Sequence, residues 1–135
     1  IMRIAFYIFL FLSIISCNNN TETNLIDNGA EFTVLGNETF DFGTITEGES
    51  VAVEFMIKNT GEGNLIITNA KASCGCTELN FPKQEIEVGE EEIIDVTFNS
   101  KGKNGTQNKK ITLTTNATPN IKILTITGTV VPKTK

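Results

Sequence analysis

The sequence predicts an all-β fold, a single antiparallel β-sandwich of about seven or eight short strands. Apolar and polar residues alternate in several short runs, as they do in strands with one buried face. Turns rich in Gly and Asn separate these runs at intervals of roughly 8 to 15 residues, which is typical of a sandwich. No segment after residue 17 shows the period of an amphipathic helix. The loops differ in length and residues 73–84 form a long excursion, which favours a sandwich over a closed barrel.

Residues 1–16 have the layout of a secretory signal peptide. Arg3 supplies one positive charge, residues 4–15 are mainly apolar, and Ser16 is a small residue before Cys17. The apolar run is too short to span a bilayer as a helix, which needs about 20 residues. A cysteine directly after a small residue at the cleavage point resembles the lipobox of bacterial lipoproteins. The resemblance implies lipid attachment at Cys17 and a membrane as the partner of the lipid. The alternative is an ordinary secretory signal in which this cysteine is incidental.

The segment after the signal is expected to be a tether. Residues 17–36 begin polar and low in complexity, which favours a lipidated N-terminus followed by a flexible linker. The sandwich domain is then expected over residues 37–135. Asn18 stands where an acidic residue would imply retention at the inner membrane by one bacterial sorting rule. We therefore expect a lipid-anchored protein of the cell envelope, at the outer membrane rather than the inner one.

Strands are expected along the rest of the chain. The clearest covers residues 51–58, where Val51, Val53, Phe55 and Ile57 alternate with residues suited to a solvent-facing side. The other expected strands cover residues 40–42, 65–72, 86–88, 94–98, 111–114 and 124–130. Segments rich in Gly and Asn at residues 59–64 and 99–108 are expected to be loops.

Composition excludes several classes of function. The chain has no histidine, so neither a catalytic triad with a His base nor a His metal ligand can form. Its formal net charge of −5 argues against nucleic acid as a partner. It has no tryptophan, and its single tyrosine, Tyr7, lies in the signal segment, so only phenylalanines remain for ring stacking, which argues against a carbohydrate-binding module. The composition favours a non-enzymatic protein.

Cys74-Gly75-Cys76 is the one cluster of reactive side chains that the sequence places in the domain. In an extended backbone the two cysteine Cα atoms would lie about 6.5 to 7 Å apart, at the far edge of disulfide geometry. Gly75 is expected to shorten this distance by adopting backbone angles that other residues avoid. Three interpretations remain open: a structural pair or staple, thiol–disulfide exchange in an oxidising compartment, or two thiolates that bind Cu(I). No other cofactor is expected.

Four short motifs resemble those of a known family: FDFG at residues 40–43, NTG at 59–61, CGCT at 74–77 and IEVG at 86–89, followed by a Gly-rich loop and Asn116. Over about residues 36–131 the chain resembles the bacterial domain of unknown function 1573 family, whose members are similar to immunoglobulin-like domains of the major-sperm-protein and Hydin type. The resemblance implies an immunoglobulin-like sandwich on an exported lipoprotein of a Gram-negative bacterium. It implies no established activity.

We therefore expect an envelope lipoprotein whose domain binds or scaffolds a protein partner. Loops at the ends of a sandwich are its usual contact surfaces, which here means residues 59–64, 74–82 and 99–108. The candidate contact residues in these loops are Asn59, Thr60, Gly61, Thr77 and Asn104. The alternative is a thiol-site protein that uses Cys74 and Cys76 for Cu(I) binding or disulfide exchange.

Overall fold

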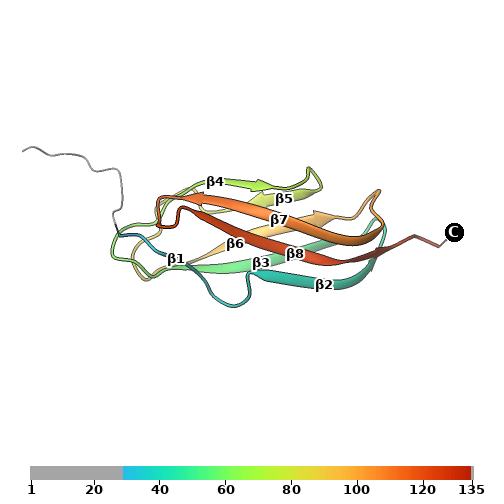
Figure 1. Cartoon of the computed structure of the whole chain (residues 1–135), viewed down its shortest axis with the longest axis horizontal. Coiled ribbons are helices and arrows are strands. Elements are labelled where there is room, and N and C mark those ends of the chain that lie inside the picture. Colours follow the sequence, from blue (N-terminus) through green and yellow to red (C-terminus); the bar gives the residue numbers. More distant parts are fainter. Residues whose placement is uncertain (1–28, 135) are drawn as a thin grey trace, which may run out of the picture.

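Two packed four-stranded sheets form the part of the chain that the computed structural model describes, residues 29–134 (Figure 1). These residues contain no helix, which confirms the all-β, immunoglobulin-like prediction. The strands are β1 (Phe32–Val34), β2 (Thr39–Thr46), β3 (Ser50–Asn59), β4 (Ile67–Ala72), β5 (Thr77–Asn80), β6 (Glu91–Asn99), β7 (Gly105–Thr115) and β8 (Ile121–Val131). The signal segment, Cys17 and most of the expected tether lie outside the described residues.

Each sheet pairs strands that are distant in the sequence. Sheet A has the order β1-β3-β6-β5, and sheet B has the order β2-β8-β7-β4. All neighbours are antiparallel except β2 and β8, which run parallel. This pair corrects the purely antiparallel expectation. It arises because the chain leaves sheet A after β1 and enters sheet B as β2, beside the last strand.

The sandwich begins earlier than the predicted boundary at residue 37. β1 (Phe32–Val34) pairs with the end of β3, from Phe32 opposite Asn59 to Val34 opposite Ile57. Ala30 is buried in the core. This part of the expected tether therefore belongs to the domain, because its alternate residues Phe32 and Val34 pack against the core.

The core lies between the sheets and consists of the alternating residues that the sequence predicts. β3 contributes Val53, Phe55 and Ile57, and β6 contributes Ile94 and Val96, all of them buried. Sheet B supplies the facing set: Ile111 and Leu113 on β7, Leu124 and Ile126 on β8. Burial of apolar area at about 25 cal/mol per Å² is the main force that holds the sheets together.

Two short elements differ from the prediction. The expected strand at residues 86–88 is a single bridge between Ile86 and Leu65, because Val88 is exposed and Gly89 turns the chain with a φ of 82°. The expected loop at 74–82 contains an edge strand, β5, that pairs with β6. Its alternation is too short to recognise, since Thr77 and Leu79 are its only inward residues.

Among residues 29–134, none of the structure forms a helix of the length and apolar character that crossing a bilayer requires.

Candidate functional site

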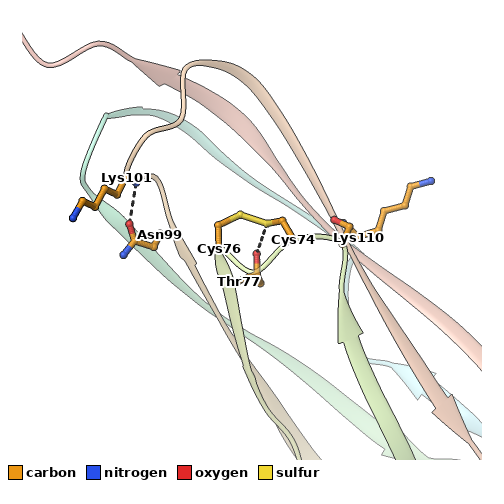
Figure 2. The surroundings of a disulfide bond; sticks show 7 residues. Cys74, Cys76, Thr77, Asn99, Lys101 and Lys110 are labelled. Carbon is orange, nitrogen blue, oxygen red and sulfur yellow. Dashed lines mark hydrogen bonds between the residues drawn. A yellow bond between two sulfur atoms is a disulfide. The ribbon is translucent and has the colours of Figure 1, made fainter.

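The Cys74–Cys76 pair forms a disulfide at the crossover from sheet B to sheet A (Figure 2). The two Cα atoms are 5.3 Å apart, within the usual disulfide range and closer than in an extended strand. The expected role of Gly75 is wrong, because its φ is not in the left-handed region. A turn at residues 75–76 shortens the distance instead.

Backbone hydrogen bonds hold this crossover to both sheets. The Ser73 N–H donates to the Lys110 carbonyl at 2.8 Å, and the Lys110 N–H donates to the Ser73 hydroxyl at 3.1 Å. On the other side, the Asn99 N–H donates to the Cys76 carbonyl at 2.9 Å. The disulfide therefore lies on a turn that β6 and β7 already position.

The two sulfurs have different surroundings. Cys74 Sγ lies 3.6 Å from the Thr77 hydroxyl, whereas Cys76 borders an open hollow of about 360 Å³. The other residues around this hollow are mostly polar: Ser50, Gly75, Glu78, Thr97, Asn99 and Lys101. The side chains of Lys101 and Lys110 extend away from the sulfurs (Figure 2). A molecule that enters this hollow therefore contacts Cys76, and the ammonium groups of Lys101 and Lys110 are directed away from the sulfur (Figure 2).

Metal binding needs ligands that the oxidised pair does not provide. Cu(I) binds thiolates, and a disulfide sulfur is not a thiolate. Within residues 29–134, no group of three or more Cys, Asp or Glu side chains converges on one point. A metal site at Cys74 and Cys76 would therefore require the reduced form.

The NTG motif has a structural role. The Asn59 side chain is fully buried, and its Nδ2 donates to the carbonyls of Gly63 at 2.8 Å and Ile86 at 2.9 Å. Its Oδ1 accepts the Gly61 N–H at 3.1 Å. Gly61 is buried, and a side chain there would overlap the carbonyl oxygen of Gly29. Asn59 and Gly61 thus fasten one end of the sandwich, and their side-chain positions are not available to a partner.

The other candidate contact residues divide into accessible and buried. Thr77, the first residue of β5, is only 8% exposed, so its side chain is also unavailable to a partner. Thr60 is exposed and its hydroxyl lies 2.8 Å from that of Thr33. Asn104 is exposed. The expectation that all five residues form contact surfaces therefore needs correction at Asn59, Gly61 and Thr77, whose burial could not be recognised in a loop sequence.

An exposed apolar row crosses the outer face of sheet A. Met56 on β3 lies directly opposite Ile93 on β6, and the Leu35 N–H donates to the Met56 carbonyl at 2.8 Å. These three side chains, called the apolar row below, are 39% (Leu35), 43% (Met56) and 38% (Ile93) exposed. Sequence reasoning missed the row. The one indication in the sequence was an apolar residue, Met56, on the otherwise polar side of the alternating strand. Only strand pairing brings the three residues together.

A second hollow lies beside this row. It has a volume of about 550 Å³ and is bordered by Phe40, Ala52, Val53, Glu54, Asp95, Val96 and Thr97. Two carboxylates, Glu54 and Asp95, face each other across β3 and β6 at its edge. None of its bordering side chains is basic.

Comparison with known proteins places the chain among proteins of undetermined role. The family described as protein of unknown function (DUF1573) matches residues 33–130. No curated protein matches the sequence.

Solved structures with a similar fold come from different contexts. A protein of unknown function from Porphyromonas gingivalis W83 has a TM-score of 0.65 at 14% identity, covering 74% of this chain and 46% of that one. The chain thus spans about half of that protein. The ASH/PapD-like domain 7 of human CEP192 has a TM-score of 0.63 at 9% identity, covering 78% of this chain and 89% of that one. The VesB protease of Vibrio cholerae has a TM-score of 0.55 at 15% identity, covering 77% of this chain and 32% of that one. Identities this low show a shared fold alone.

Proposed function

The chain belongs to the DUF1573 family, and we propose that it is a lipid-anchored envelope protein with a non-enzymatic, protein-binding immunoglobulin-like domain. The observation that carries the binding role is the apolar row of Leu35, Met56 and Ile93 on the outer face of sheet A. Single exposed apolar residues are normal on a protein surface, but a contiguous group beside a hollow is typical of an interaction site. The contact surface proposed here is therefore a sheet face.

The chemistry of the chain supports a role without catalysis. It has no histidine, so a nucleophile cannot be activated by an imidazole base. The similarity to the Vibrio cholerae protease covers 32% of that protein and concerns the fold. A sandwich of this kind serves many unrelated functions, so function must be inferred from the surface residues and not from the fold. Here those residues form an apolar face.

The proposed location rests on the N-terminal sequence. A short apolar run that ends in Ser16-Cys17 supports export and lipid attachment, and Asn18 supports the outer membrane. Replacing Cys17 by Ala is expected to abolish lipid attachment, so that the protein no longer partitions into the detergent phase of a Triton X-114 extract. Normal processing with unchanged partitioning of Cys17→Ala would contradict the lipoprotein proposal.

Photo-crosslinking in cells tests the binding role. A photoreactive amino acid in place of Met56 is expected to form a discrete crosslinked species, and Ile93→Glu in the same chain is expected to abolish it. The matched control carries the photoreactive residue in place of Asn69, which is exposed on β4 of the other sheet. Equal crosslinking from positions 56 and 69, or insensitivity to Ile93→Glu, would contradict a binding site on sheet A.

Thiol–disulfide exchange is the second candidate, and the exposure of Cys76 to the polar hollow favours it. A thiolate of a partner protein would attack Cys76 Sγ, the Cys74–Cys76 bond would break, and Cys74 would leave as a thiolate. The Thr77 hydroxyl, 3.6 Å from Cys74 Sγ, would donate a hydrogen bond to that thiolate. A measured reduction potential well below about −300 mV would argue against cycling, since such a disulfide stays closed.

The reduced pair is also the form that would bind Cu(I). Titration of the reduced protein against a competing chelator tests this alternative, with the Cys74→Ser, Cys76→Ser double variant as the control. A dissociation constant no tighter than that of the double variant would rule out a copper role.

A further inference from the structure

The switch of the chain between sheets leaves part of β3 without a neighbour. β1 pairs with β3 only at residues 57–59, and the Leu35 N–H adds one bond to the Met56 carbonyl. After Leu35 the chain crosses to sheet B, where β2 pairs with β8 (Figure 1). Residues 50–55 of β3 therefore form an open edge of sheet A within the described chain.

The backbone groups that face this edge can be identified from the hydrogen-bond pattern. Groups of successive residues in a strand point alternately to its two sides, and the β3–β6 register is unbroken. The Asn59 N–H bonds to the Glu90 carbonyl on the β6 side, and the Met56 carbonyl bonds to Leu35 on the other side. The N–H and C=O of Ala52 and Glu54 therefore point away from β6. Neither residue has a backbone partner on that side within residues 29–134.

The 550 Å³ hollow lies against the same residues. Ala52 and Glu54 border it, and Phe40, 37% exposed, forms an apolar part of its wall. Glu54 and Asp95 give it negative charge, and no basic side chain borders it. Asp95 accepts a hydrogen bond from the Asn80 amide at 3.0 Å, but within residues 29–134 neither Glu54 nor Asp95 forms an ion pair. An edge with open backbone hydrogen-bonding groups, an apolar contact and carboxylates without a cation is complementary to an extended segment that carries cations.

We propose that an extended segment of a partner protein adds a strand to sheet A beside residues 50–55 of β3, with Lys or Arg side chains over the acidic hollow. The added strand would continue the line of β1 and would saturate the groups of Ala52 and Glu54. Its alternate side chains, in line with Val53, would be apolar and would lie near Phe40. This inference rests on the proposed binding function and names the chemistry of the partner.

A second copy of the chain is a poorer occupant of this edge. Pairing of two β3 edges would bring two acidic hollows, each with Glu54 and Asp95, next to each other. Like charges on neighbouring strands are destabilising. A basic segment from another protein has the opposite charge and also gains association rate from electrostatic attraction.

The probe is a synthetic peptide, acetyl-Lys-Val-Lys-Val-Lys-Val-amide, labelled with fluorescein and titrated with the purified full-length chain in a non-ionic detergent. We expect saturable binding that weakens with added salt, because charge pairing contributes to it. The matched peptide with Glu in place of each Lys is expected not to bind. Absence of measurable binding by the Lys peptide would overturn the proposal.

Two N-methylated peptides test whether the backbone takes part. One carries N-methyl groups on its Lys residues and the other on its Val residues, so that each lacks the N–H donors on one side of the strand. Antiparallel addition would use the donors of residues directly opposite Ala52 and Glu54, and parallel addition would use those between them. One of the two peptides is therefore expected to lose binding. Equal, unweakened binding of both would overturn strand addition.

Protein variants locate the site. Glu54→Lys is expected to weaken binding of the Lys peptide at least tenfold. Ala52→Pro removes an N–H that faces the open edge, where proline is tolerated, and is expected to abolish binding without unfolding the chain. The control is Glu62→Lys, the same charge change at an exposed residue of the loop that follows β3. Equal effects of Glu54→Lys and Glu62→Lys would show attraction by net charge alone and would overturn the site.

Two further readouts separate the outcomes. Amide hydrogen exchange at Ala52 and Glu54 is expected to slow on binding of the Lys peptide, and unchanged exchange there would overturn the proposal. Concentration-dependent dimerisation that Ala52→Pro removes would also overturn it, in favour of a second copy at this edge. If the crosslink at position 56 forms while the peptide fails to bind, the inference fails and the proposed binding function stands.

Discussion

Asn59 shows how one buried polar side chain can organise the end of a sandwich. Its amide makes three hydrogen bonds with backbone groups of residues 61, 63 and 86, so every polar atom of the side chain is satisfied. Its own N–H and C=O bond to Glu90 and Gly89. A buried polar group is stabilising only when its hydrogen bonds are complete, and here they join two loops to the end of β3.

Replacement of Asn59 by Ala is expected to lower the free energy of unfolding by about 2 to 4 kcal/mol, because three backbone groups lose their partner. The measurement is the urea midpoint at constant m-value. Asn104→Ala is the control, since Asn104 is exposed and is expected to change stability by less than about 0.5 kcal/mol. Equal effects at the two positions would mean that the Asn59 hydrogen bonds contribute little.

Of two glycines in the family motifs, Gly61 and Gly75, only Gly61 lies where a side chain would not fit. A Cβ at Gly61 would overlap backbone atoms of Gly29 and Glu31, whereas a Cβ at Gly75 meets no atom within 4 Å. We expect Gly61→Ala to lower the free energy of unfolding by about 1 to 3 kcal/mol through steric overlap. Gly75→Ala is expected to change it by less than about 0.5 kcal/mol. Thermal unfolding of both variants is the measurement. A destabilised Gly75→Ala would show that this turn requires glycine after all.

β6 is the central element of sheet A, and its inward residues carry much of the core. Ile94, Val96 and Phe98 are each at most 1% exposed. The Phe98 ring stacks on Phe42 of β2, with ring centroids 5.5 Å apart, so that it joins the two sheets. Gly128 on β8 makes room for this contact, because a Cβ there would overlap the Phe42 ring.

Phe98→Ala is expected to lower the free energy of unfolding by about 3 to 5 kcal/mol, because it leaves a cavity and removes the contact with Phe42. Guanidinium denaturation followed by circular dichroism measures the loss. Phe40→Ala is the matched control, since the Phe40 side chain is 37% exposed and is expected to cost less than half as much. A reversed order would mean that Phe40, and not Phe98, is the aromatic residue on which the core depends.

At the scale of the whole molecule, buried polar side chains secure both ends of the sandwich. Asn59 does so at one end, and Ser100 does so at the other, where its fully buried hydroxyl accepts the Gly48 N–H at 3.0 Å and donates to the Glu49 carbonyl at 2.7 Å. The disulfide lies at a crossover that backbone hydrogen bonds already attach to β6 and β7. We therefore expect the fold to close without the disulfide.

The Cys74→Ser, Cys76→Ser double variant is accordingly expected to keep its fold. A disulfide that closes so small a loop restricts the unfolded chain little, which corresponds to roughly 1.5 kcal/mol of stability. Far-UV circular dichroism is expected to match the wild type, with a small decrease in the thermal midpoint. Loss of the β spectrum would show instead that the staple is required for folding.

The sequence by itself determined the all-β class, the inward residues of β3 and β6, and the closeness of Cys74 and Cys76. These features are local: alternation has a period of two residues, and a Cys-Gly-Cys triplet is visible without a fold. Pattern alone could not recognise β5, since a strand with two inward residues gives too short an alternation.

Tertiary structure alone decided which residues of the predicted loops are accessible and which surface is open. Asn59 is buried through contact with Ile86, which lies 27 residues further along the chain. Thr77 is buried because β5 pairs with β6. The apolar row and the open edge of β3 exist because the chain leaves sheet A after Leu35 and joins β8 in parallel. Such long-range pairings depend on the packing of the whole molecule, and for this reason the candidate binding face could not be read from any single segment.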